Sequence, residues 1–267
     1  MSKIKKQKKI LIRKKANKPF FSIITVVKNA EKDIMQTINS VKKQTFKNFE
    51  YLIIDGKSTD RTVKNILIHQ KYINLLISEK DGGIYYAMNK ALKFVNGEVV
   101  VIINAGDVFV KNALLTIYKK FKKNPSAEFI FGTVKRHYVG STILKYGFNK
   151  HRLKYNFDFA TAHSAGFFIK KKAMDRIGNY NTIFKYSADY DLYYRALIKF
   201  NLRGDYTQKK ELIGIFKSGG FSSKISFFNH LLEETKIRLH NNQNIILVSI
   251  IFLNSLVKYF IKKNINL

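Results

Sequence analysis

Apolar positions in the first half of the chain follow two alternating patterns. Short apolar runs rich in β-branched residues predict strands that are buried on both faces. Between these runs, apolar residues recur at the three- and four-residue spacing of a helix. The predicted strands are residues 20–27, 49–55, 73–78 and 99–103, and the predicted helices surround Ile34, Ile38 and Val41, then Val63, Ile66 and Leu67, then span 84–95 and 112–123.

This alternation predicts the fold class. Strands and helices in turn give an α/β fold with a Rossmann-type, mainly parallel central sheet flanked by helices. The second half is less regular: it predicts strands over 128–134, 166–171 and 211–217, the last at a sheet edge, and a helix over 187–200. From about residue 224 the pattern is helical to the last residue.

Polar residues follow each predicted strand of the first half. In a doubly wound sheet, ligands bind outside the carboxyl ends of the strands, so these residues predict a site along one rim. They are Lys28 and Asn29; Asp55, Ser58 and Asp60; Glu79, Asp81 and Gly82; and Asn104 and Asp107.

The charge of the chain points to an anionic partner. The 49 Lys and Arg residues against 18 Asp and Glu residues give a formal net charge of +31. Nucleic acid, an acidic membrane surface or a phosphorylated substrate would each fit, and so would a compositional bias towards lysine. The lysines are scattered over helices and termini, whereas a nucleic-acid surface interleaves basic and aromatic residues, so we expect no nucleic acid partner.

The two ends of the chain differ in character. Residues 1–18 predict a mobile basic arm, followed by a main domain over 19–223 and a C-terminal helical segment over 224–267. Residues 244–263 are nearly all apolar, but Asn254 and Lys258 interrupt the run, which is then shorter than the roughly 20 residues of a spanning helix. We expect this helix to lie on an anionic membrane surface, the alternative being a helix packed on the protein itself.

Several catalytic classes lack their motifs. GxGxxG after the first strand, GxxxxGK[ST], GxSxG and His/Cys metal spacings are all absent, which argues against a Rossmann dehydrogenase, a P-loop kinase and a serine hydrolase. With no cysteine, disulfides and thiolate metal sites are excluded.

Carboxylates therefore carry the candidate chemistry. Asp55 could accept hydrogen bonds from a base or ribose, or serve a turn; Asp107 could hold Mg²⁺, or cap a helix. Asp191 and Arg195 are spaced for an i,i+4 ion pair. That pair would leave Asp189 as a general base, although acidic residues also favour the first turn of a helix for structural reasons.

Five stretches in order carry a resemblance to a known family: SIITVVKNA, IIDGKSTDRT, SEKDGGIYYAMNKAL, VVVIINAGD and SADYDLYYR. Over about residues 19–222 the chain resembles the family 2 inverting glycosyltransferases of the GT-A fold. It is most similar to the branch that builds bacterial surface polysaccharides.

The resemblance implies roles for individual residues. Asp107 would hold a divalent metal, Mg²⁺ or Mn²⁺, on the donor diphosphate, and Asp189 would deprotonate the acceptor hydroxyl. The nucleotide and donor sugar would lie against Thr25, Val27, Asp55, Asp81, Gly82, Gly83, Asn89, Lys90 and Asn104.

Three positions limit how far the roles of the family's residues apply to this chain. Asn104 stands where many members have an Asp, which removes one negative charge from the metal site. Ala91 replaces a Gly that usually follows AMNK. His163, in TAHSAGFF, could face the acceptor or be structural.

The predicted function follows from motifs and chemistry together. Displacement at an anomeric carbon needs a base on one face and a stabilised leaving group on the other, a division that Asp189 and Asp107 would satisfy. We expect an inverting hexosyl- or N-acetylhexosaminyltransferase that moves a sugar from a UDP-linked donor to a lipid-linked or surface-glycan acceptor. It would act in lipopolysaccharide, capsule or exopolysaccharide synthesis, in the cytoplasm at the inner face of the cell membrane. The alternatives are a basic nucleic-acid-binding protein and an inactive scaffold of the same fold.

Overall fold

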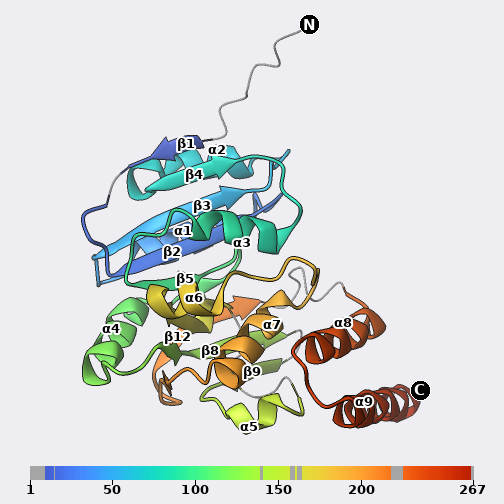
Figure 1. Cartoon of the computed structure of the whole chain (residues 1–267). Helices are drawn as coiled ribbons and strands as arrows, with labels where there is room; N and C mark the ends of the chain where they lie inside the picture. The colour runs from blue at the N-terminus through green and yellow to red at the C-terminus, as the bar shows by residue number, and fades with distance from the viewer. Residues whose placement is uncertain are drawn as a thin grey trace, which may run out of the picture.

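A large twisted sheet forms the centre of the molecule (Figure 1). The computed structural model describes residues 10–14, 16–138, 141–156, 160, 164–217 and 225–265. Within them, eight strands make up the central sheet, in the order β1-β4-β3-β2-β5-β10-β7-β11. Their bounds are β1 Ile10–Arg13, β2 Phe21–Val27, β3 Phe49–Asp55, β4 Leu75–Ser78, β5 Val99–Ile102, β7 Phe129–Phe131, β10 Phe167–Lys170 and β11 Gly204–Tyr206.

The sheet is mainly parallel, as the sequence predicts. Strands β4, β3, β2 and β5 are parallel neighbours. Strand β10 is antiparallel to both β5 and β7, so β7 and its parallel partner β11 run in the same direction as β5. The carboxyl ends of β2, β3, β4 and β5 therefore lie along one rim, and the predicted site residues with them.

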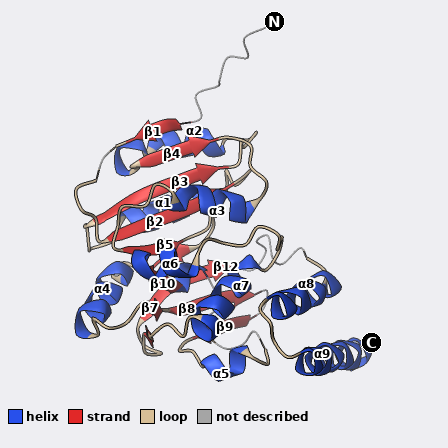
Figure 2. Cartoon of the chain, viewed as in Figure 1, coloured by secondary structure: helices blue, strands red, loops and turns tan. Residues whose placement is uncertain are grey.

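Helices cover both faces of this sheet (Figure 2). Successive strand residues point to opposite faces, so Ile23 packs in the core with α1, α2 and α4, and Ile24 packs in the core with α3, α6 and α7. Both residues are fully buried, which explains the unbroken apolar run around them. The helices are α1 Ile34–Lys42, α2 Thr62–Ile68, α3 Ile84–Leu92, α4 Ala113–Lys123, α5 Lys150–Leu153, α6 Lys171–Ile177, α7 Ala188–Tyr194, α8 Phe227–His240 and α9 Ile245–Ile265, with shorter turns at Gln70–Tyr72, Ser164–Gly166 and Arg195–Lys199.

A second sheet of four described strands was not predicted. Its order is β6-β12-β8-β9, with bounds β6 Val108–Phe109, β8 Thr133–Tyr138, β9 Ser141–Lys145 and β12 Leu212–Lys217. Residues 128–134 are divided at Gly132 between the two sheets: an added Cβ there would lie 2.8 Å from Ile213, so only glycine allows this approach. The expected edge strand at 211–217 is instead internal, between β6 and β8.

The basic arm also needs a correction. Residues 1–9 and 15 lie outside the described part, but Ile10–Arg13 form β1, antiparallel to β4 at the edge of the central sheet. Ile12 is buried there while its neighbours are exposed, so a single apolar side chain anchors the strand. The arm is therefore structured over these four residues.

The C-terminal segment contains two helices that break at Asn242, whose φ is +59°. Helix α9 packs on α8 through the ring of Tyr259, which stacks on Phe227 with centroids 4.2 Å apart. Its opposite side exposes large apolar residues (Ile245, Ile246, Ile250, Leu253, Val257, Phe260 and Ile261). Among the described helices, none combines the length and apolar composition needed to cross a bilayer.

Candidate active site

Three rim segments meet at Gly56, which directly follows β3. A Cβ added to Gly56 would lie 3.0 Å from Oδ2 of Asp81 and 3.3 Å from the Lys28 side chain. The end of β2, the end of β3 and the loop before α3 therefore converge, as the strand order requires. Asp81 is held in this position by the backbone N–H of Gly83, which donates to its Oδ1 at 3.0 Å.

Asp55 is deeply placed at this junction. Its carboxylate is fully buried and accepts hydrogen bonds from the backbone and hydroxyl of Ser58 and, at 2.6 Å, from the hydroxyl of Ser78. The carboxylate thus fixes the turn after β3 and links it to the end of β4. The structure therefore shows the turn role of Asp55, and its contact with a base or ribose stays a prediction.

Thr25 lies inside the sheet rather than on the rim. Its hydroxyl donates to the carbonyl of Ile103 at 2.8 Å and lies 2.9 Å from the hydroxyl of Tyr51. The residue is fully buried and Val27 is nearly so, so the Thr25 side chain offers no exposed atom to a nucleotide. The exposed residues at this end of β2 are Lys28 and Asn29.

Helix α3 begins at the exposed pair Gly82 and Gly83. Gly83 has a φ of +132°, a conformation that strongly favours glycine, and forms the N-cap of the helix. Lys90 on this helix forms an ion pair with Glu79 at 2.6 Å. The start of α3 therefore leaves an open backbone surface next to Asp81.

Asn89 is engaged with the protein's own backbone. Its side-chain Nδ2 donates to the carbonyl of Tyr180 at 2.8 Å, and its Oδ1 accepts the N–H of Tyr180 at 2.9 Å. Both ends of the amide thus hold α3 against the segment before α7. The donor contact implied for Asn89 stays a prediction.

Asn104 and Asp107 share one turn at the end of β5, where the backbone N–H of Asp107 donates to the carbonyl of Asn104 at 3.0 Å. The buried hydroxyl of Thr37 clamps this turn, accepting from the N–H of Gly106 at 2.9 Å and donating to the carbonyl of Asp107 at 2.8 Å. Burial raises the pKa of Asp107 from its usual 3.8 to about 8. A carboxylate in this condition gains strongly from a nearby cation.

The same turn offers a second oxygen. Oδ1 of Asn104 is buried and has no hydrogen-bond partner among the described residues, whereas its Nδ2 donates to Ser164 at 3.1 Å. Carboxylate and amide oxygens suit Mg²⁺ or Mn²⁺, and Mg²⁺ needs only one or two protein carboxylates where phosphates and waters complete its shell. The residues present therefore fit a divalent metal, although no cluster of three His, Cys, Asp or Glu residues occurs in the described part.

Asp189 lies in the first turn of α7 and contacts helix α3. Its Oδ1 lies 3.1 Å from the hydroxyl of Tyr85 on α3 and accepts the backbone N–H of Tyr190 at 3.0 Å. Burial raises its pKa, while the hydrogen bonds and the charge of His230 lower it. This combination favours a carboxylate that accepts protons more readily than an exposed one.

The neighbouring Asp191 forms the predicted ion pair with Arg195, so its role is structural. Nε of Arg195 donates to its Oδ2 at 2.8 Å, and Asn241 after α8 donates to its Oδ1 at 2.8 Å. Arg195 also donates to the carbonyls of Ile177 and Asn179. Both oxygens of Asp191 thus accept hydrogen bonds within the protein, and Asp189 is the carboxylate of this helix that faces α3.

Glu233 on α8 is a residue that sequence reasoning missed. Its two carboxylate oxygens accept the backbone N–H groups of Lys185 and Tyr186, each at 2.6 Å. It thereby fixes the segment that leads into Asp189, from a position 44 residues further along the chain. No local sequence pattern identifies this role of Glu233. Tyr85 lies inside one of the family motifs, but no role is predicted for its hydroxyl from the sequence. His163 lies outside the described residues.

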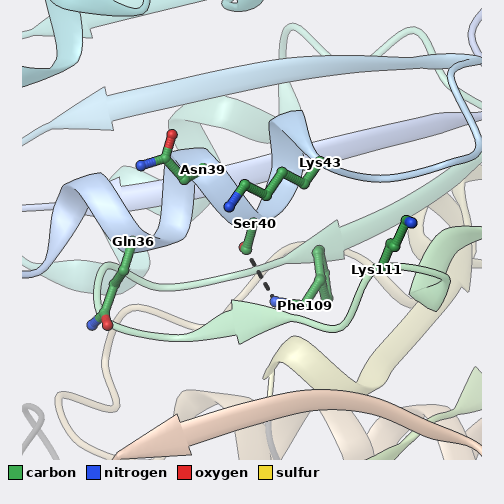
Figure 3. A pocket seen from close by; sticks show the side chains of 6 residues that line it. All are labelled: Gln36, Asn39, Ser40, Lys43, Phe109 and Lys111. Atoms are coloured by element: carbon green, nitrogen blue, oxygen red, sulfur yellow. Dashed lines mark hydrogen bonds between the residues drawn. The ribbon is translucent and has the colours of Figure 1, made fainter.

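A cavity of about 650 Å³ lies beside the Asp107 turn, between α1 and β6 (Figure 3). Gln36 connects the cavity to the Asp107 turn, because it lines the cavity and donates to the carbonyl of Gly106 at 3.0 Å. No carboxylate lines this cavity, so it lacks the acid–base groups of the rim. Its described lining is Gln36, Asn39, Ser40, Lys43, Phe109 and Lys111.

Comparison with known proteins agrees with this arrangement. Residues 22–195 match the family described as Glycosyl transferase family 2. A UDP-Glc:alpha-D-GlcNAc-diphosphoundecaprenol beta-1,3-glucosyltransferase of Escherichia coli is 36% identical over 113 residues, which is 42% of this chain and 44% of that protein. A PGL/p-HBAD biosynthesis glycosyltransferase of Mycobacterium bovis is 27% identical over 184 residues, 67% of this chain and 70% of that protein.

Solved structures share the fold. TarS 1-349 of S. aureus in complex with UDP-GlcNAc has a TM-score of 0.65 at 18% identity, covering 90% of this chain and 72% of that one. The mannosyltransferase PcManGT of Pyrobaculum calidifontis, in complex with GDP-Man and Mn²⁺, has a TM-score of 0.62 at 14% identity, covering 92% and 72%. At these identities the likeness supports the GT-A-like fold and nothing finer.

Proposed function

Because the chain belongs to glycosyl transferase family 2, we propose that it transfers a sugar from a nucleotide-sugar donor to an acceptor hydroxyl with inversion at the anomeric carbon. The observation that carries this proposal is the contact between Tyr85 and Asp189. Through this contact Asp189, the candidate base, touches a side chain of α3, the helix that begins at the Asp81–Gly83 loop. This contact supports a single site bordered by the base and the donor loop.

The chain's own residues account for the proton and the position of the donor. The Asp189 carboxylate takes the proton of the acceptor hydroxyl, and that oxygen bonds to the anomeric carbon as the bond to the diphosphate breaks. The transition state is oxocarbenium-like, so the nucleophile and the leaving group lie on opposite faces of the sugar. Asp55, Asp81 and the open backbone at Gly82 and Gly83 border the nucleotide and donor sugar in this proposal.

A divalent metal fits the turn at the end of β5. Asp107 and Oδ1 of Asn104 would hold Mg²⁺ or Mn²⁺, which supplies positive charge to the leaving diphosphate when bound. One carboxylate fewer than in many relatives makes the site depend more on the donor's own phosphates.

The substrates are proposed from chemistry and from relatives. The E. coli relative is named for UDP-Glc and a diphosphoundecaprenol-linked GlcNAc, and TarS was solved with UDP-GlcNAc. We therefore expect a UDP-hexose or UDP-N-acetylhexosamine donor and a lipid-linked glycan acceptor of a bacterial surface polysaccharide. The exposed apolar side of α9 and the charge of +31 suit a peripheral position on the anionic inner face of the cell membrane.

A donor panel tests the proposal. The purified protein is incubated with UDP-, GDP- and dTDP-sugars and a lipid-linked acceptor, with and without Mg²⁺ or Mn²⁺, and nucleotide release is measured. We expect metal-dependent release from a UDP-sugar. Donor binding without release from any member of the panel would instead support the inactive scaffold.

A further inference from the structure

We propose that a groove between residues 183–186 and helix α8 binds the phosphate and the first apolar units of the lipid on a lipid-linked acceptor. This inference rests on the proposed function and adds the place where the acceptor's lipid lies. It follows from the position of the groove against the segment that leads into Asp189, from its charge and from the apolar helix α9 that packs on α8.

The groove has a volume of about 430 Å³ and is mainly apolar at its walls. Ile183 contributes one wall and Leu232 of α8 the other, and these side chains are 68% and 50% exposed. Phe184 is buried at the same place and packs edge-on against His240, with centroids 5.6 Å apart. Two large apolar side chains are thus held open to solvent on either side of a recess.

The wall of the groove is joined directly to the candidate base. The hydroxyl of Tyr85 lies 3.0 Å from the carbonyl of Tyr186 and 3.1 Å from Oδ1 of Asp189. Tyr186 also lines the groove, and its N–H is fixed by Glu233 of the opposite wall. The groove therefore borders the segment that leads into Asp189, towards which an acceptor hydroxyl must extend.

The charge of the groove favours an anion. Lys236 and His240 line it, and exposed Lys185 is adjacent in sequence to two lining residues. The carboxylate of Glu233, the acidic group among the described lining residues, is turned to the N–H groups of Lys185 and Tyr186. The remaining charge at the groove is positive, which suits the phosphate of a lipid carrier.

An apolar surface leads from the groove to α9. Phe228 lies one helical turn from Leu232 and is 45% exposed, and its ring lies 5.5 Å from that of Tyr259 on α9. The exposed apolar residues of α9 lie on the side of this helix away from Tyr259 and recur every three or four residues, at Ile246, Ile250, Leu253, Val257 and Phe260. Figure 1 shows α8 and α9 together on one side of the molecule.

The position of α9 beside the groove helix favours one occupant. An acceptor whose lipid stays in the membrane must reach the base from the bilayer, and α9, whose exposed apolar side would lie on that bilayer, packs directly on the groove helix α8. Together with the cationic lining, this arrangement fits an anionic amphiphile better than a second copy of this strongly basic chain, which would meet the same positive charge.

The test compares Ile183→Gln/Leu232→Gln with Ile68→Gln, a matched change of an exposed residue on α2, far from the groove. Transfer is measured with an acceptor bearing a long prenyl diphosphate and with the same acceptor on a short, water-soluble alkyl group. We expect the groove variant to raise the KM for the long-chain acceptor about tenfold or more, because apolar burial is lost, and to leave the short-chain KM within twofold. Equal effects on both acceptors, or none, would overturn the proposal.

Calorimetric titration with farnesyl diphosphate gives a readout that needs no turnover. The wild type and Ile68→Gln should bind it, and the groove variant should bind it about tenfold more weakly. If the wild type shows no transfer but this binding pattern holds, the proposed function fails and the groove stands. Light scattering separates the remaining case: a dimer in the wild type that the groove variant abolishes would make this surface a subunit interface and overturn the inference.

Discussion

The hydroxyl of Tyr85 on α3 lies 3.1 Å from Oδ1 of Asp189 on α7, two residues separated by 104 positions in the chain. The same hydroxyl lies 3.0 Å from the carbonyl of Tyr186. A phenol has one proton and also accepts, so it can donate to Asp189 when the carboxylate is charged. When Asp189 is protonated, the phenol can accept from it and donate to Tyr186 instead. Tyr85 thus accommodates both protonation states of the base.

Replacing Tyr85 by Phe should shift the pH dependence of transfer. The hydrogen bond stabilises the charged carboxylate, so its loss raises the pKa of Asp189 further. The acidic limb of the kcat profile should then move to higher pH, while the donor KM changes less than twofold. Tyr180, Tyr193 and His230 also face this carboxylate and stay in place. Tyr86→Phe, at the exposed adjacent position, is the control, and an unchanged profile in Y85F would contradict the role.

Asp189→Asn should abolish transfer without unfolding the protein. Loss of a general base costs roughly 10²–10⁴ in kcat. The amide keeps an oxygen for Tyr85 and the N–H of Tyr190, so the thermal midpoint should change by only a few degrees. Nucleotide release with the preferred donor and acceptor measures the first effect and calorimetry the second. Wild-type transfer by D189N would refute the proposed mechanism.

Asp191→Ala, unlike Asp189→Asn, should strongly lower the stability of the protein. It removes the acceptor for Arg195 and Asn241 and leaves a half-buried guanidinium without its carboxylate. Breaking a buried pair from one side lowers the free energy of unfolding by about 3–5 kcal/mol. Denaturant titration checks this value. A loss below about 1 kcal/mol would show that the network contributes little.

Metal binding should strengthen as the pH rises towards 8. Burial raises the pKa of Asp107 from 3.8 to about 8, so below pH 8 the folded protein keeps a proton there that a metal must displace. Without metal, the folded state binds more protons than the unfolded one between about pH 4 and 8, and stability falls as pH rises through this window. The increase in Tm produced by Mn²⁺ and UDP should therefore be larger at pH 8.5 than at 6.5. Asp107→Asn should remove this pH dependence.

Ending the chain after Gln243 should reduce membrane binding. The truncation removes α9 and its exposed apolar side. Sedimentation with vesicles that contain anionic lipid should show the full chain in the pellet and the truncated chain in the supernatant. Replacing Ile246, Leu253 and Val257 together by Gln, with α9 retained, should give the same result. If both variants still sediment with the vesicles, the basic body of the protein makes the contact.

Local sequence determined the elements around the rim. The run at 49–55 is a strand with the predicted bounds, because a segment buried on both faces must be apolar at nearly every position. The Asp191–Arg195 pair was predictable for a similar reason, since residues four apart face each other on a helix. The resemblance to the family also rested on short contiguous stretches of sequence.

Only the tertiary structure decided which distant groups meet. The second sheet, the pairing of β1 with β4, the hold of Asn89 on Tyr180 and that of Glu233 on Lys185 and Tyr186 all join segments that periodicity treats as unrelated. Thr25 shows the same limit at one residue: the family resemblance implies a nucleotide contact there, but its hydroxyl turns into the sheet to Ile103 and Tyr51. A sequence sets the local conformation of each segment, whereas the partners of a buried polar group depend on packing across the whole chain, because each must find a hydrogen bond where water is excluded.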